Sequence, residues 1–95
     1  MAKVEIYTKS WCGYSTLAKD HLDSKGVSYE EIDVTTDSIR ESEMVKRSAR
    51  HTVPQIFIGG YHLGGSDDLL AAESSGRLDR LLSGQTEGEA EGQAA

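Results

Sequence analysis

The sequence predicts an α/β domain in which a four-stranded mixed sheet is flanked by helices. Two observations support this fold class. Before residue 50 the apolar spacing changes twice from the two-residue period of a strand to the period of a helix. Two short strand-like runs then follow with only two glycines between them. Strands joined through a helix pair in parallel, whereas a two-residue turn joins antiparallel strands. The expected order is therefore β-α-β-α-β-β-α with a final helical turn.

Four of these elements are expected before residue 50. Residues 4–8, VEIYT, read as a strand that either alternates between inward and outward side chains or lies fully buried. Residues 13–25 place apolar side chains at helical intervals, and Gly26 supplies a helix stop. Residues 27–34, VSYEEIDV, predict the second strand. Residues 38–49 predict a solvent-facing helix with capping candidates just before it.

A hairpin is expected next, in the stretch HTVPQIFIGGYHLGG. Residues 55–58 and 61–63 are its two short strands, and Gly59 and Gly60 form the turn. Both central positions of a type I′ turn need positive φ, which glycine adopts without steric cost.

The last predicted helix begins where Ser66 or Asp67 can cap it, and a short helix follows over residues 77–82. The folded domain is expected to span residues 1–82. Residues 83–95, SGQTEGEAEGQAA, have no apolar periodicity and several glutamates, which predicts a disordered acidic tail.

Composition narrows the class of partner and the compartment. The formal net charge of −6 argues against nucleic acid or an anionic membrane as partner, because both require a basic surface. The chain has a single cysteine, which indicates a reducing compartment, most simply the cytoplasm. We expect no secretory signal, no membrane span and a monomer. The three histidines share no ligand spacing, so no metal site is expected.

The single cysteine, Cys12 in KSWCGYS, is expected at a strand-to-helix junction. The first N–H groups of a helix have no partner within the helix, and its dipole favours an anion there. A thiolate at such a point is stabilised, and Lys9 adds positive charge nearby. The alternative from these residues alone is an inert buried cysteine.

Two further stretches offer groups that could bind a peptide. Pro54 in TVPQIFI directly precedes a strand, and its peptide bond is either cis, with the backbone of Val53 turned outward, or trans at the start of an edge strand. In LGGSDDL, the start of a helix suits a carboxylate, and Asp67 can accept a hydrogen bond from an ammonium group. Plain helix capping explains the same residues.

Taken together, WCGYS, TVPQIFI and GGYHLGGSDDL resemble the glutaredoxins of the thioredoxin superfamily, in particular the small bacterial members. The resemblance runs from residue 3 to about residue 82. It implies a thioredoxin-like fold, a cis bond before Pro54, and a glutathione-dependent thiol–disulfide oxidoreductase with glutathione as cosubstrate. Disulfide-containing and glutathionylated proteins are the expected substrates.

The resemblance also implies roles for individual residues. Cys12 is the implied nucleophile, Val53 pairs with the glutathione backbone, and Arg40 is a weaker candidate for the glycine carboxylate. Lys46, Arg47 and Arg50, expected on the second helix, are interpreted mainly as a solvated charged face. The implied glutathione-binding residues are Lys9, Tyr14, Thr52, Val53, Pro54, Gly65, Ser66 and Asp67.

Ser15 departs from the dithiol members of the family, which carry a second cysteine at this position. A serine cannot form a disulfide, so the expected route is a monothiol mechanism through Cys12. Two interpretations of Ser15 remain open, a native residue or an engineered replacement, and the dithiol-like remainder of the chain favours replacement. A second function is also open, because CGYS is near the CGFS motif of glutaredoxins that carry a [2Fe–2S] cluster as a glutathione-ligated homodimer.

Overall fold

The chain folds into a four-stranded sheet with helices on both faces, as a computed structural model of residues 2–84 shows. The strand order is β2-β1-β3-β4. β1 pairs in parallel with β2 and antiparallel with β3, and β3 pairs antiparallel with β4. The predicted mixed sheet and element order are confirmed. The elements are β1 (Val4–Thr8), α1 (Gly13–Ser24), β2 (Glu30–Asp33), α2 (Ser38–Ser48), β3 (Gln55–Ile58), β4 (Tyr61–Gly64), α3 (Ser66–Ser75) and α4 (Arg77–Leu82).

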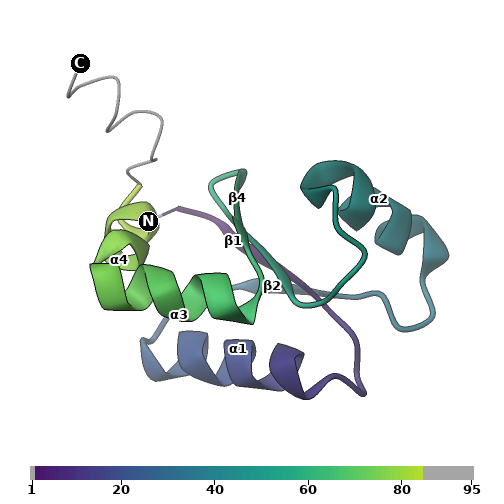
Figure 1. Cartoon of the computed structure of the whole chain (residues 1–95), viewed down its shortest axis with the longest axis horizontal. Coiled ribbons are helices and arrows are strands. Elements are labelled where there is room, and N and C mark those ends of the chain that lie inside the picture. Colours follow the sequence, from purple (N-terminus) through teal and green to yellow (C-terminus); the bar gives the residue numbers. More distant parts are fainter. Residues whose placement is uncertain (1, 85–95) are drawn as a thin grey trace.

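Two apolar cores lie on opposite faces of the sheet. Figure 1 shows α1 and α3 on one side of the strands and α2 on the other. The first core joins Val4 and Ile6 of β1 to Leu22 of α1 and to the C-terminal helices. The second core joins Tyr7 and Phe57 to α2. β1 is therefore buried on both faces, as the fully buried alternative for this strand predicted.

The hairpin between β3 and β4 turns at the two glycines. Gly59 has a φ of 58° and Gly60 a φ of 84°, which is the positive pair expected of a type I′ turn. The register shifts by one between Ile56 and Phe57, so β4 contains one extra residue near Leu63. Such a bulge bends a strand and changes where its side chains point.

The second strand is shorter than the sequence predicted. Residues 27–34 were the expected span, whereas β2 covers Glu30–Asp33. The Val27 N–H donates to the Leu22 carbonyl, and Gly26 has a φ of 70°. This segment therefore completes the end of α1 before the chain extends, and Val27 packs into the core instead of pairing in the sheet.

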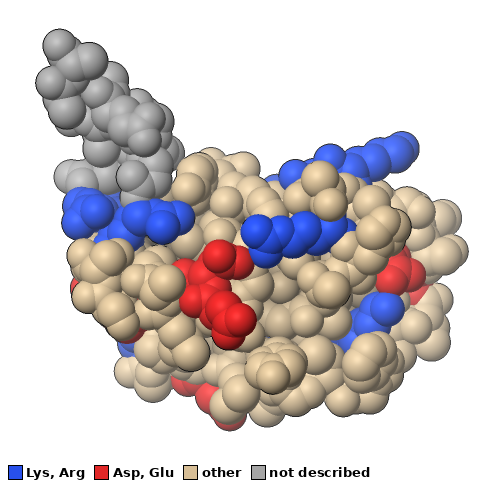
Figure 2. All heavy atoms as spheres, viewed as in Figure 1, with Lys and Arg blue, Asp and Glu red and all other residues tan. Residues whose placement is uncertain are grey.

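α4 ends at Leu82, and the domain boundary at this residue stays a prediction. The predicted tail, residues 83–95, lies outside the described residues except for its first two and remains a prediction. Within residues 2–84, no helix is long and apolar enough to cross a membrane. On the face shown in Figure 2, acidic and basic side chains lie next to one another and form no surface of a single sign.

Truncating Leu22 tests the packing of α1 against the sheet. Its side chain is fully buried, so Leu22→Ala should lower the free energy of unfolding by about 2–5 kcal/mol. Leu17→Ala is the matched control on the same helix, because Leu17 is 61% exposed. The control should stay within about 0.5 kcal/mol of the parent in urea unfolding. Equal losses in both variants would contradict the described packing.

Candidate functional site

Cys12 occupies the N-cap position of α1, directly before the first helical residue. Its backbone is extended, with φ −91° and ψ 114°, and its side chain makes no capping hydrogen bond. The sulfur therefore lies beside amides of the first helical turn, as the sequence predicted. The residue is 9% exposed, and its thiol donates to the Val53 carbonyl at 3.6 Å. Cys12 thus faces the loop before β3.

The pKa of the Cys12 thiol lies below its usual value. Burial acts to raise this pKa, but the hydrogen bonds that the Ser15 amide and hydroxyl and the Tyr14 amide can donate to the thiolate outweigh burial, and the charge of Lys9 adds to them. Hydrogen bonds from the helix start thus favour the thiolate over the thiol. Because the thiolate is the nucleophile, this placement activates Cys12.

Ser15 has a buried hydroxyl that can donate a hydrogen bond to the Cys12 thiolate. Its side chain is 1% exposed, and within residues 2–84 its Oγ has no hydrogen-bond partner. Leaving a buried hydroxyl without a partner costs free energy. Loss of the Cys12 proton supplies an acceptor next to this hydroxyl, so Ser15 favours the thiolate even though it cannot form a disulfide.

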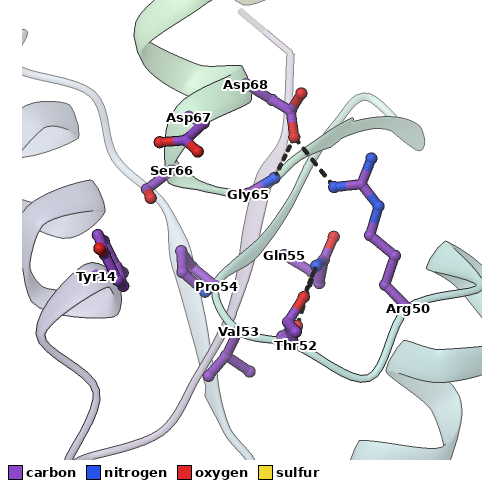
Figure 3. A pocket seen from close by; sticks show the side chains of 10 residues that line it. All are labelled: Tyr14, Arg50, Thr52, Val53, Pro54, Gln55, Gly65, Ser66, Asp67 and Asp68. Atoms are coloured by element: carbon purple, nitrogen blue, oxygen red, sulfur yellow. Dashed lines mark hydrogen bonds and ion pairs between the residues drawn. The ribbon is translucent and has the colours of Figure 1, made fainter.

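A pocket opens between α1, the loop before β3 and the start of α3. Figure 3 shows side chains from these segments around it, with Tyr14 on one side and Arg50 on the other. Seven of the eight residues expected to bind glutathione line this pocket, and Lys9 does not. The lining residues are Tyr14, Arg50, Thr52, Val53, Pro54, Gln55, Gly65, Ser66, Asp67 and Asp68.

The backbone of Val53 lies open at this pocket. The Val53–Pro54 peptide bond is cis, as the resemblance implied, in contrast to the trans alternative. Among the described residues, the Val53 N–H has no hydrogen-bond partner, and its carbonyl accepts only from Cys12. One donor and one acceptor on the same residue can pair with the backbone of an extended peptide.

The start of α3 is capped differently from the prediction. Ser66 or Asp67 was the expected cap, but Gly65 is the N-cap and Asp68 accepts from the Gly65 N–H at 2.9 Å. The pKa of Asp68 is lowered, first by this hydrogen bond and then by Arg50, which lies 3.1 Å away. Because Asp68 does the capping, Ser66 and Asp67 keep their side chains available at the pocket (Figure 3).

The positions of the cationic side chains differ most from what the sequence predicted. Lys9 forms an ion pair with Glu41 at 2.9 Å, and Arg40 lies 3.4 Å from Glu43, so both lie off the pocket lining. Lys9 still acts on Cys12 through its charge.

The interpretation of a solvated charged face was wrong for Arg47, whereas Arg50 is solvent-exposed but does not lie on α2. The Arg47 guanidinium lies 3.9 Å from the Phe57 ring centroid and binds Glu5 at 3.0 Å, so it is part of the α2–sheet packing. Arg50 lies two residues beyond the end of α2 and lines the pocket.

Sequence reasoning missed the supporting roles of three lining residues. Arg50 and Asp68 form an ion pair at the pocket rim, and Gln55 is fully buried behind the loop. The only sequence signal was the second aspartate of LGGSDDL, three residues after Gly65, which is the spacing of a capping box.

Within residues 2–84, no group of three or more histidine, cysteine or acidic side chains is arranged to hold a metal ion.

A parallel strand–helix–strand unit, an antiparallel hairpin, a cysteine at the start of α1 and a cis-proline loop facing it define a thiol protein with a thioredoxin-like fold. The sequence model of the glutaredoxin family matches residues 4–63. Glutaredoxin 3 of Escherichia coli K12 is 54% identical over 82 residues, which cover 86% of this chain and 99% of that protein. The chain therefore belongs to the glutaredoxin family, whose members are glutathione-dependent oxidoreductases.

Solved structures agree with this assignment. The solution structure of a glutaredoxin from Brucella melitensis has a TM-score of 0.79 and 46% identity, and the match covers 90% of this chain and 95% of that one. The crystal structure of a buckwheat glutaredoxin–glutathione complex has a TM-score of 0.80 and 27% identity, with coverage of 86% and 77%.

Removing the Ser15 hydroxyl should raise the pKa of Cys12. Ser15→Ala takes away a donor to the thiolate, so the curve of iodoacetamide alkylation rate against pH should move to higher pH. Below that pKa the rate should fall about three- to tenfold, because lower thiolate fraction outweighs higher intrinsic nucleophilicity. Ser24→Ala, at the far end of α1, is the control and should leave the curve in place. An unchanged curve for Ser15→Ala would contradict the role given to the hydroxyl.

Adding a methyl group at Gly64 should disturb the cap of α3. Gly64 has a φ of 125°, and a Cβ there would lie 2.2 Å from Asp68 Oδ2. Gly64→Ala should therefore lower the free energy of unfolding by about 1–3 kcal/mol, measured by urea unfolding. Gly13→Ala is the control, because a Cβ at Gly13 meets nothing within 4 Å. Parent-like stability for Gly64→Ala would show that Asp68 is not held as described.

Proposed function

We propose that the protein reduces glutathione mixed disulfides by a monothiol mechanism through Cys12. One observation carries this proposal: the only thiol of the chain has a lowered pKa and faces the backbone of Val53, whose carbonyl it contacts, at the edge of the pocket. A nucleophile and a docking edge for a short peptide thus lie side by side. Glutathione, a tripeptide with two carboxylates and an ammonium group, is the proposed ligand.

In the proposed complex, glutathione lies extended along Val53. The N–H and carbonyl of Val53 pair with the cysteine moiety of glutathione, which brings its sulfur next to Cys12. Deprotonation of Cys12 helps this pairing. The Val53 carbonyl, 3.6 Å from the Cys12 sulfur, then no longer accepts a hydrogen bond from the thiol. The Tyr14 ring, 63% exposed, forms one wall of the pocket, and Pro54 lines it next to Val53.

The γ-glutamyl end of glutathione is proposed to bind at the start of α3. Free N–H groups of the first turn, from Ser66 onward, suit its carboxylate. Asp67 is exposed at the same place and suits its ammonium group. Gly65 lets the ligand approach the backbone closely. Thr52 closes the pocket on the other side with its hydroxyl. Lys9 is proposed to act mainly by its charge on Cys12, since its amine is held by Glu41.

The proposed reaction has two thiol–disulfide exchanges. The Cys12 thiolate attacks the glutathione sulfur of a glutathionylated protein, and the protein leaves as a thiolate that takes up a proton. Cys12 is then in a disulfide with glutathione. A second glutathione, as thiolate, attacks the glutathione sulfur of that adduct, which releases oxidised glutathione and regenerates the Cys12 thiolate. The low pKa of Cys12 favours both its attack and its departure.

This cycle requires no second cysteine, so Ser15 does not block it. The hydroxyl contributes instead by favouring the thiolate in both exchanges. Whether Ser15 is native or a replacement does not change the chemistry of the cycle. A serine also prevents the adduct from resolving internally, so the Cys12–glutathione disulfide can be released only by an external thiol.

The proposal predicts turnover in a coupled assay. With a glutathionylated peptide, glutathione, glutathione reductase and NADPH, the protein should consume NADPH, and Cys12→Ser should lose at least 99% of the rate, about two orders of magnitude or more. The rate of the first exchange should rise with pH and level off at a pH below the usual pKa of a cysteine, because the pKa of Cys12 is lowered. Intact-mass analysis should show one glutathione on Cys12 when free glutathione is withheld.

The same sample separates the cluster-carrier function from the oxidoreductase. Anaerobic reconstitution with iron, sulfide and glutathione should leave the protein colourless and unchanged in size on gel filtration. A brown dimer without turnover would favour the cluster carrier over the proposed reductase.

A further inference from the structure

Three side chains form a hydrogen-bonded chain behind the loop that carries Val53. The Gln55 Nε2 amide donates to the Thr52 carbonyl at 3.0 Å and to the Thr52 Oγ1 at 3.2 Å. On its other side, Gln55 Oε1 lies 2.7 Å from His62 Nε2. Gln55 is fully buried, so water cannot replace these partners. Figure 3 shows its amide directed at Thr52 from behind the pocket.

The chemistry of the three groups determines the direction of every hydrogen bond. The Thr52 carbonyl can only accept, so the nitrogen of the Gln55 amide must face Thr52. The amide oxygen must then face His62, and because that oxygen can only accept, the His62 ring must donate from Nε2. The chain therefore runs from His62 through Gln55 to Thr52.

The sheet brings these residues to one place. His62 on β4 pairs with Phe57 on β3, and Gln55 lies two residues before Phe57 on the same face. The His62 ring packs on Phe57 with centroids 4.9 Å apart. The bulge in β4 follows His62 directly. His62 thus connects the hairpin to the loop through Gln55, and its own side chain does not line the pocket.

The ring of His62 is kept neutral in this position. Burial lowers the pKa of His62, the positive charge of Arg50 lowers it further, and Arg47 adds to this effect, while Asp68 opposes it. A neutral imidazole has one donor and one acceptor nitrogen. The donor must be Nε2, because Gln55 Oε1 requires a hydrogen there.

We propose that His62 is a positioning residue for glutathione, which acts through Gln55 to hold Thr52 and the adjoining Val53 edge in their binding geometry. This inference rests on the proposed function, because it assigns the support of the same site. His62 touches no ligand in this account. Its effect reaches the ligand through two hydrogen bonds to Thr52 and the peptide unit that joins Thr52 to Val53.

The hydrogen bonds from Gln55 also determine how the Thr52 hydroxyl is oriented. Its Oγ1 accepts from Gln55, so its own hydroxyl proton is directed elsewhere. Thr52 is exposed at the pocket, where that proton can be donated to an acidic group of the ligand. Without Gln55 in place, the hydroxyl could rotate and present its oxygen instead. The chain therefore favours an anionic group opposite Thr52.

Replacing His62 should weaken binding of an unreactive glutathione analogue. His62→Phe keeps a ring against Phe57 but removes the donor to Gln55, so the Kd of S-methylglutathione, measured by calorimetry on the folded protein, should rise about fivefold. His62→Gln supplies an N–H donor again and should recover most of the affinity. In the coupled assay, His62→Phe should raise the KM for the glutathionylated peptide with little change in kcat. The iodoacetamide profile of Cys12 should not move.

A matched control separates positioning from general loss of stability. His21→Phe removes a partly buried contact of 2.8 Å to Glu73, between α1 and α3, and should lower stability while leaving the Kd unchanged. Parent-like affinity in His62→Phe, or equal affinities in His62→Phe and His62→Gln, would overturn the inference. Analogue binding without turnover in the parent protein would remove the proposed reductase activity and leave the positioning role standing. No analogue binding in the parent would remove the positioning role, and the coupled assay would then decide the reductase activity by itself.

Discussion

The site depends on the stabilisation of one sulfur anion by the start of α1. Unpaired N–H groups at Tyr14 and Ser15, with the Ser15 hydroxyl, outweigh the burial that would otherwise keep Cys12 protonated. This balance requires both parts. Burial sets the sulfur against the Val53 loop, and the helix start keeps it reactive there. A cysteine one turn further along α1 would lose these donors and become an inert core residue.

The sheet then supplies the geometry in which that anion is useful. The central strand β1 leads directly to Cys12, and its antiparallel partner β3 is preceded by the Val53–Pro54 loop, so both arrive at the same end of the sheet. β4 runs antiparallel to β3, so its C-terminal end and the start of α3 lie at this end as well. Segments from three parts of the chain thus surround one pocket, and Gln55, buried beneath it, ties the loop to the hairpin.

Local sequence predicted what depends on local structure. The glycine pair of the hairpin and the position of Cys12 before a helix follow from turn and capping preferences of short segments. The cis bond before Pro54 followed only from the family resemblance, because the residues alone favour the commoner trans bond. The packing of Arg47 on Phe57 and the role of Gln55 depend on strand register and a bulge, which no short segment specifies. The same holds for the start of β2, because Val27, which was predicted as the first residue of this strand, completes the end of α1 instead.

The protonation of one atom, the Cys12 sulfur, decides whether the site is reactive, and titrating that atom tests it most directly. The ¹³C shift of the Cys12 Cβ, followed against pH in labelled reduced protein, reports the thiol and thiolate forms separately. A midpoint below the value of about 8.5 for free cysteine is the predicted result. A midpoint at or above it would show that burial prevails over the helix start, and would contradict the account of a poised nucleophile.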